Sequence, residues 1–215
     1  MTSLRVLQFD PSNITGSFGL LIVGDVRDEN NNPLNVNLPL ATSTTNFFRE
    51  SRLSKIGNIN VPSSGSFDIS FWYSPNLSEI GTIDASSATS LRFAFKNCTN
   101  LVTVGNITTT SALTNIERIA DNCSKLQRLV ISDCSQVTNT NLALLVTRSI
   151  NELILTGLTV GIDASQNSLS ATAINNFFTS LGTASGSQTV NVSLNPGSAT
   201  CDTTIATAKG FTVIT

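Results

Sequence analysis

The sequence of 215 residues contains no histidine, and this absence removes several kinds of site at once. Ser-His and Cys-His pairs cannot form, and no Ser-x-x-Lys motif offers a lysine as the base instead. The four cysteines form no Cys-x-x-Cys pair, so the usual zinc constellations are also missing. We therefore expect no catalytic residue, no metal site and no cofactor.

Charged residues are scarce too, at 12% of the chain where about 25% is usual. The net charge is −2 and basic residues form no run, which argues against nucleic-acid binding through phosphate contacts. No apolar stretch approaches the ~20 residues that a membrane helix needs, and the N-terminus lacks the apolar core of a signal peptide. We expect neither membrane insertion nor export by a signal peptide.

What the sequence does contain is a repeat. The leading apolar residues recur every 24 or 25 positions, at Leu53, Leu77, Leu101, Leu126 and Ile150. In three copies a glycine follows the next apolar residue, at Gly57, Gly81 and Gly105. A constant step of this length is typical of a solenoid, because one coil cannot bury its apolar side alone and must stack on the next.

Two copies carry almost the same phrase around a cysteine. Asn97-Cys98-Thr99-Asn100-Leu101 corresponds to Asn122-Cys123-Ser124-Lys125-Leu126, so Cys98 and Cys123 should stack one coil apart. Ser74 and Thr147 stand at the same position in other coils. We interpret this position as a tight buried corner filled by small side chains. A disulfide between adjacent coils is the alternative.

The later coils change character, because helix signals enter between the strands. Ile174, Phe177 and Phe178 fall on one helical face, which begins after Ser170 and ends before Gly182. The expected elements are strands at 125–131, 153–155, 190–194 and 211–214, and helical segments at 142–146, 171–181 and 203–209. We expect one solenoid over residues 46–215, with parallel strands on one face and, on the other, loops early and helices late.

Residues 1–45 do not fit the repeat. The stretches 4–9, 18–26 and 34–40 favour strands, and the last of them alternates apolar and polar residues. We expect an N-terminal β-hairpin arm here. It would cap the first open edge of the solenoid, attach the chain to another subunit, or do both.

The repeat phrases resemble those of a known family. The two cysteine phrases, with residues 111–116 between them, resemble the BspA-like leucine-rich repeat, and Leu126-x-x-Leu129-x-Ile131-x-x-Cys134 resembles the cysteine-containing leucine-rich repeat. The resemblance covers about residues 46–215 and implies an α/β repeat solenoid with short parallel strands. BspA-like repeats are known in cell-surface adhesion modules and in phage tail-fibre, baseplate and head-decoration proteins.

Trp72 and Tyr73 are the candidate ligand or interface residues. They are the only tryptophan and the only tyrosine of the chain. Phe71 aligns with Phe47 and Phe95 on the expected inward row, whereas Trp72 and Tyr73 fall off that row and are candidates for exposure. An exposed aromatic pair suits sugar stacking or a protein interface.

Carboxylates supply weaker candidates. Two acids about 5–10 Å apart can hydrolyse a glycosidic bond. The acids that stacked coils could bring together are Glu79, Asp84, Glu117, Asp121 and Asp133. Asp25, Asp28 and Glu29 cluster with residues 30–32 but lack the spacing of a calcium-binding EF-hand. Ordinary surface acids and a solvated turn are the simpler interpretations.

Repeats, low charge, the expected lack of a signal peptide and the resemblance together favour a non-enzymatic structural protein of a phage virion. We expect the N-terminal arm to attach to neighbouring virion subunits, and the chain to form homo-oligomers within the assembly. The alternative is an adhesin or receptor-binding module, on a virion or a bacterial cell surface, that recognises a host glycan or protein. A carboxylate glycosidase on a parallel β-helix is the third hypothesis.

Overall fold

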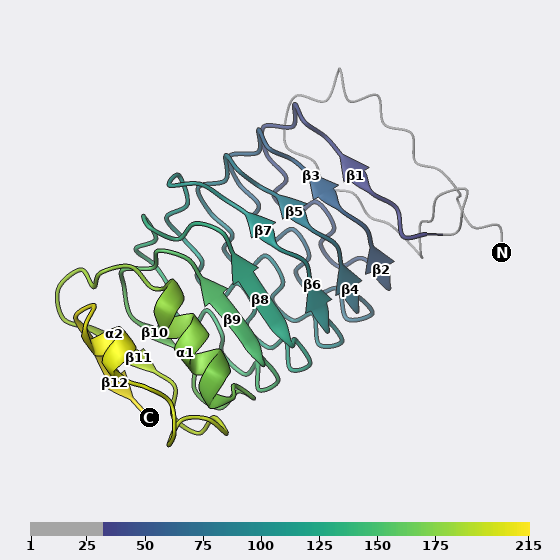
Figure 1. Cartoon of the computed structure of the whole chain (residues 1–215). Helices are drawn as coiled ribbons and strands as arrows, with labels where there is room; N and C mark the ends of the chain where they lie inside the picture. Colours follow the sequence, from purple (N-terminus) through teal and green to yellow (C-terminus); the bar gives the residue numbers. More distant parts are fainter. Residues whose placement is uncertain (1–31) are drawn as a thin grey trace.

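Residues one repeat apart lie side by side in the structure. Ile59 pairs with Ile83, and Ile83 pairs with Ile107, in parallel register. The computed structural model describes residues 32–215, and over this range the chain is a parallel β-solenoid of about seven coils with few helices (Figure 1). The period seen in the sequence is therefore the step from one coil to the next.

The strands form three parallel sheets. The first has the order β1 (Val36–Asn37), β3 (Ile59–Asn60), β5 (Ile83–Asp84), β7 (Ile107–Thr108), β8 (Arg128–Ile131) and β9 (Glu152–Leu155). The second has the order β2 (Lys55–Ile56), β4 (Glu79–Ile80) and β6 (Thr103–Val104). The third has the order β10 (Ile162–Asp163), β11 (Gln188–Asn191) and β12 (Phe211–Ile214). We call the side of the coils that carries the first two sheets the strand wall.

A row of glycines divides each early strand pair. Gly57, Gly81 and Gly105 stack so closely that a Cβ on Gly105 would lie 2.6 Å from the carbonyl carbon of Gly81. Only a residue without a side chain fits such a close backbone approach. From β8 on, the glycine is missing and a single strand of four residues spans the wall. The glycines therefore mark a corner, and they do not lengthen a continuous strand.

The opposite side of the early coils is built from turns. Residues 45–50, 68–73, 92–97, 117–122 and 141–146 form corresponding turn segments, which together make the turn wall. The second and sixth residues of every segment have positive φ: Asn46, Ile69, Phe93, Arg118 and Leu142, then Glu50, Tyr73, Asn97, Asn122 and Val146. The helical turn expected at 142–146 is thus wrong, because left-handed residues at both ends break an α-helix.

Hydrogen bonds join each turn segment to the next. The amides of Asn46 and Phe48 donate to the carbonyls of Asp68 and Ser70, at 3.1 and 2.6 Å. The amides between them donate within their own coil, as from Phe47 to the carbonyl of Thr44 at 3.1 Å. The turn wall is therefore a ladder, although it contains no regular strand.

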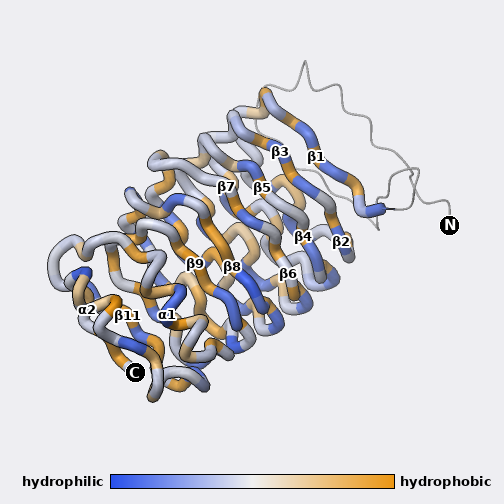
Figure 2. Tube along the Cα trace, viewed as in Figure 1, coloured by the Kyte–Doolittle hydropathy of each residue, from blue (hydrophilic) through white to orange (hydrophobic). Residues whose placement is uncertain are grey.

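Apolar side chains from both walls fill the coils. Along β3 the buried Ile59 is followed by the half-buried Asn60, and Figure 2 shows this alternation repeated from strand to strand. Phe71 stacks on Phe48 at 5.1 Å and on Phe95 at 6.0 Å between ring centroids. Phe48, not Phe47, therefore aligns with Phe71, because the first turn segment lies 23 residues before the second.

The cysteine corner is filled as predicted. Cys98 and Cys123 are free thiols, and each donates to a carbonyl one coil back, to Phe71 at 3.0 Å and to Phe95 at 2.9 Å. Ser74 makes the corresponding bond to the carbonyl of Phe48, at 2.9 Å. Burial raises the pKa of Cys98 to about 12, so this thiol is neutral at physiological pH. The disulfide alternative is not present.

After β9 the two walls exchange roles. Helix α1 (Ala171–Ser180) packs against β9, and its Ser180 carbonyl accepts from the amide of Gly157 at 2.7 Å. Helix α2 (Thr204–Thr207) packs on α1 and on β12. The strands β10, β11 and β12 leave the strand wall and form their own sheet, which begins beside the turn segment 141–146. The expectation that all strands share one face is therefore wrong.

The predicted late helices and strands and the predicted N-terminal arm can be compared with the structure. Ser170 caps α1 by accepting from the amide of Ala173, as expected, but the second helix covers only part of 203–209. Strand β11 begins two residues earlier than expected, whereas β12 matches the predicted 211–214. Of the predicted arm, β1 pairs in parallel with β3, and the stretches 4–9 and 18–26 lie outside the described residues.

Candidate binding surface on the turn wall

Trp72 and Tyr73 close the second turn segment, and both side chains point outward from the core row of Phe71. Tyr73 is 57% exposed and occupies a position with a φ of 60°. No other described residue holds its hydroxyl in a hydrogen bond. Tyr73 thus lies where the sequence places it, on the surface.

Trp72 is half-buried and is held by a cation. The guanidinium carbon of Arg49, one coil earlier, lies 4.3 Å from the centroid of the indole ring. A contact of this kind contributes about 0.5–2 kcal/mol. The indole Nε1 is buried without a hydrogen-bond acceptor among the described residues. Arg49 therefore covers one face of the Trp72 ring. Trp72 does not form an open platform, and of the two aromatic residues only Tyr73 is exposed.

Phe93 extends the aromatic surface onto the third coil. The guanidinium of Arg92 lies 4.2 Å and the ammonium of Lys96 5.2 Å from the centroid of its half-buried ring. Phe93 was not predicted as a surface residue, and it lies two residues before the buried Phe95. Alignment by turn segments would have found it, since Phe93 shares the outward position of Ile69.

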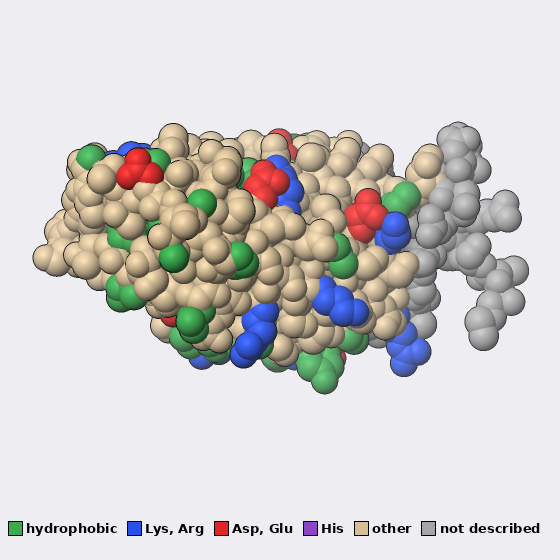
Figure 3. All heavy atoms as spheres, turned by 60° about the horizontal axis from the view of Figure 1, so that its bottom comes forward, with side chains coloured by type: hydrophobic (Ala, Val, Ile, Leu, Met, Phe, Trp, Pro, Cys, Tyr) green, Lys and Arg blue, Asp and Glu red, His purple; other side chains and the backbone are tan. Residues whose placement is uncertain are grey.

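Ion pairs among the described residues mostly join one coil to the next. Four of the six ion pairs among the described residues join adjacent coils: Lys55–Glu79, Arg92–Glu117, Lys96–Asp121 and Arg128–Glu152. The nearest N–O distances of these four lie between 2.6 and 3.1 Å. On the face that Figure 3 shows, few charged side chains interrupt a surface of uncharged side chains and backbone. The charge therefore serves the stacking of coils more than the binding of ions.

The carboxylates considered for glycoside hydrolysis each have a partner of their own. Glu79, Glu117 and Asp121 lie in the ion pairs above, and Asp121 also bonds Arg118 at 2.8 Å. Asp84 accepts from the amide of Ser86 at 3.1 Å, and Asp133 accepts from the amide of Ser135 at 2.9 Å. Ion pairs between or within coils and bonds to turn amides are the contacts that these five acids make.

Metal and membrane features can be judged only over residues 32–215. In that part of the chain no three side chains of Cys, Asp or Glu converge as metal ligands. No helix in it has both the length and the apolar character needed to cross a bilayer. Asp25, Asp28 and Glu29 of the candidate calcium loop lie outside this range.

The turn wall therefore offers an aromatic and cationic surface across its first three turn segments, defined by Arg49, Trp72, Tyr73, Arg92, Phe93 and Lys96. We call it the aromatic face. Aromatic side chains with arginine beside them are enriched in protein interfaces, and rings with exposed faces can also stack on sugars.

Comparison of the chain with protein-family models, with curated proteins and with solved structures finds no match.

Proposed function

We propose that this chain is a non-enzymatic structural protein of a phage virion, built as a leucine-rich-repeat solenoid. The observation that carries the proposal is the bonding between coils: ladders run along both walls of the early coils, and most ion pairs reinforce them. Such a body holds its surface in a fixed shape. A fixed shape suits a component whose task is assembly.

The leucine-rich-repeat assignment is supported by the late coils. Three phrases of these coils follow the pattern of an apolar pair and then Asn or Cys. They are Leu129-x-Ile131-x-x-Cys134, Ile162-x-Ala164-x-x-Asn167 and Val190-x-Val192-x-x-Asn195. Both asparagines are buried and bond the main chain. Asn195 accepts from the amide of Leu169 at 3.1 Å and donates to the carbonyl of Val192 at 2.8 Å.

The proposal includes attachment to neighbouring virion subunits, or to further copies of the chain, through the N-terminal segment. Deleting residues 1–31 tests this, because it keeps Leu34 and Val36, which already bond to the next coil. The shortened chain should melt as the full chain does by circular dichroism, yet be missing from phage particles purified on a density gradient. A full-length Tyr73→Ser variant, incorporated normally, is the control. Normal incorporation of the shortened chain would contradict the proposal.

A second candidate function rests on the aromatic face. The exposed Tyr73, with two cation-covered rings nearby, suits an adhesin or receptor-binding module, on a virion or a bacterial surface, for a host glycan or protein. Binding of the isolated chain to host cells should then fall at least roughly tenfold in Tyr73→Ala, as for other aromatic residues at the centre of interfaces. Leu194→Ala, at a 74% exposed site in the late coils, should bind normally. Equal binding by both variants argues against this function.

A further inference from the structure

The ladder of the turn wall stops at the segment 141–146. In each of the four preceding steps the second, fourth and sixth amides donate to the next coil, and the last of these steps is made by Arg118, Ala120 and Asn122 at 3.0, 3.0 and 2.7 Å. The corresponding amides belong to Leu142, Leu144 and Val146. They have no acceptor in the described part of the chain. Three donors, spaced as in every other coil, therefore end in an open row.

The next coil lies opposite this row but does not bond to it. The Thr140 hydroxyl donates to the carbonyl of Gly161 at 2.6 Å, and the Thr147 hydroxyl donates to Asn167 at 2.9 Å. Between these two contacts no main-chain bond of the described residues joins the two coils. The later coil donates onward, as from the amide of Ala164 to the carbonyl of Asn191 at 2.8 Å, but its carbonyls accept from none of the three open amides. An extended strand also rises by about 3.3 Å per residue, which does not match a row of turns.

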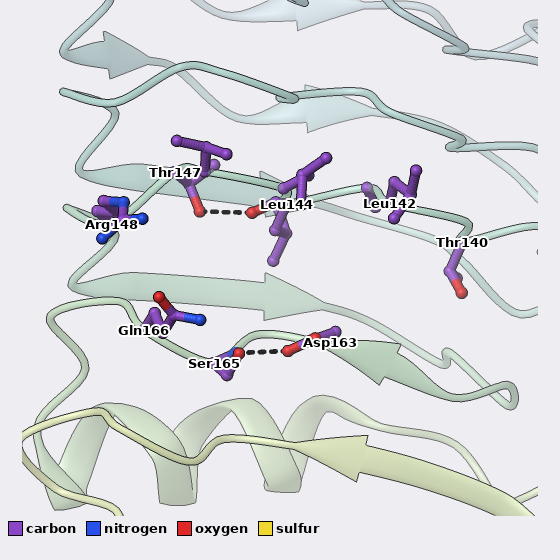
Figure 4. A pocket seen from close by; sticks show the side chains of 11 residues that line it. Thr140, Leu142, Leu144, Thr147, Arg148, Asp163, Ser165 and Gln166 are labelled. Carbon is purple, nitrogen blue, oxygen red and sulfur yellow. Dashed lines mark hydrogen bonds between the residues drawn. The ribbon is translucent and has the colours of Figure 1, made fainter.

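The result is a slot between 141–147 and 161–167, with a hollow of about 180 Å³ (Figure 4). Figure 4 shows Leu142 and Leu144 on one side, and Asp163, Ser165 and Gln166 on the other. The slot is small, so it has room for a main chain with small side chains and not for large ones.

The side chains at the rim add apolar area and two charges without an ion pair among the described residues, Arg148 and Asp163. Leu142, Leu145 and Val146 are 39%, 42% and 41% exposed, which is unusual for large apolar residues in this chain. Arg148 is exposed and makes no ion pair with a described residue, unlike Arg92 and Arg128. The slot therefore combines backbone donors with a cation at the end where the turn segment finishes.

We propose that this slot binds a short peptide main chain of a partner protein, parallel to residues 141–147, with small side chains and a carboxylate at its C-terminal end. The earlier coils show what satisfies such a row: three carbonyls at alternate residues of a chain that runs in the same direction. Main-chain bonding of this kind supplies affinity with little dependence on sequence. The parallel direction places the C-terminal end of the peptide beside Arg148, which pairs with its carboxylate.

Amide exchange in the full ¹⁵N-labelled chain is the first measurement. In the free protein, the amides of Leu142, Leu144 and Val146 should exchange about 100-fold faster than those of Arg118, Ala120 and Asn122, because only the latter are bonded. Slow exchange at the first three would mean that the chain itself, or a second copy, already fills the slot. That outcome would overturn the proposal.

The probe is a pair of acetylated, amidated hexapeptides, Gly-Ala-Gly-Ala-Gly-Asp and the same peptide with Asn in place of Asp. The Asp peptide should slow exchange at the three open amides and leave Ala143, Leu145 and Thr147, which are bonded within the segment, unchanged. Uniform slowing, or no effect at millimolar peptide, would refute main-chain docking. The Asn peptide should bind roughly tenfold more weakly, as expected for loss of a charge-assisted bond.

Two variants with one control separate the slot from a general surface effect. Arg148→Asn should abolish the preference for the Asp peptide, whereas Arg52→Asn, at another exposed arginine, should keep it. Ser165→Trp should fill the hollow and remove binding of both peptides, with an unchanged melting temperature. Binding that survives Ser165→Trp in a folded chain would place the peptide elsewhere and overturn the proposal.

Discussion

The early coils and the late coils stack apolar layers in the same direction, but they satisfy their backbones differently. Up to the segment 141–146, amides of both walls bond to the neighbouring coil. In the late coils α1 and α2 bond internally, and side chains such as Ile174 and Phe178 make the contact between layers. The comparison teaches that α1 replaces the ladder of the strand wall after β9, whereas the slot lies on the turn wall, where strand β10 follows the segment 141–146.

The ionisation of the cysteine thiols should show the largest difference between the early and the late coils. The pKa values of Cys98 and Cys134 are raised by burial from 9.0 to about 12, whereas Cys201 in the late coils is only partly buried. Below pH 9 both folded and unfolded thiols are protonated, so the thiols do not affect stability. Between pH 9 and pH 12 the unfolded thiols lose protons first, and the free energy of unfolding should fall by about 1 kcal/mol per pH unit and thiol.

Chemical denaturation at a series of alkaline pH values measures this loss. Cys98→Ser should make the slope shallower, since Ser74 shows that a hydroxyl fits the corner. In the native state near neutral pH, a thiol reagent such as Ellman's reagent should label Cys201 first. Rapid labelling of Cys98 or Cys123 before unfolding would show that the early corner is not closed.

The glycine corner of the early coils should give the next largest effect. In Gly81→Ala the new Cβ would lie 2.7 Å from the carbonyl carbon of Gly57. The backbones must then move apart, at a cost of about 2–3 kcal/mol in the free energy of unfolding. Gly65→Ala is the matched control, because its nearest atom is the Thr42 carbonyl oxygen at 3.7 Å. If urea denaturation gives the two variants the same stability, the corner does not explain the glycines.

The smallest effect should come from the last turn segment, where the two regions meet. Val146 is a β-branched residue with a φ of 59°, a backbone conformation that costs roughly 1 kcal/mol and that asparagine tolerates better. Val146→Asn should therefore raise the free energy of unfolding by about 0.5–1 kcal/mol. Leu145→Asn, with nearly the same exposure and no positive φ, should not be stabilising. Stabilisation by both variants would point to lost surface apolarity instead of relieved strain.

The sequence was sufficient for the repeat and for its buried rows, because a constant step forces equivalent residues such as Ile59 and Ile83 into contact. It was also sufficient for α1, where Ser170 and the apolar spacing agree. It was insufficient at 142–146, since capping residues before an apolar run fit a helix and a turn segment equally well. Whether the amides of 142–146 bond within their own segment, as in a helix, or to the next coil depends on the coil that packs beside them.

The aromatic face was predicted only in part, because some of its contacts depend on how neighbouring coils align. The exposure of Tyr73 follows from its place beside the inward Phe71. The contact of Arg49 with Trp72 depends on the 23-residue step of that coil, which a repeat counted from the leucines does not reveal. The exchange of walls after β9 depends on long-range packing, and no local pattern around Gly157 predicts it.

Because each ladder bond joins residues about one coil apart, such as Asn46 and Asp68, the chain distance that must be closed is nearly the same at every step. Loop closure then costs each coil a similar entropy, and a formed coil is a ready template for its neighbour. Folding should therefore start at one well-packed pair of coils and spread outward in both directions. The last turn segment, which no later ladder holds, should be where that spread slows.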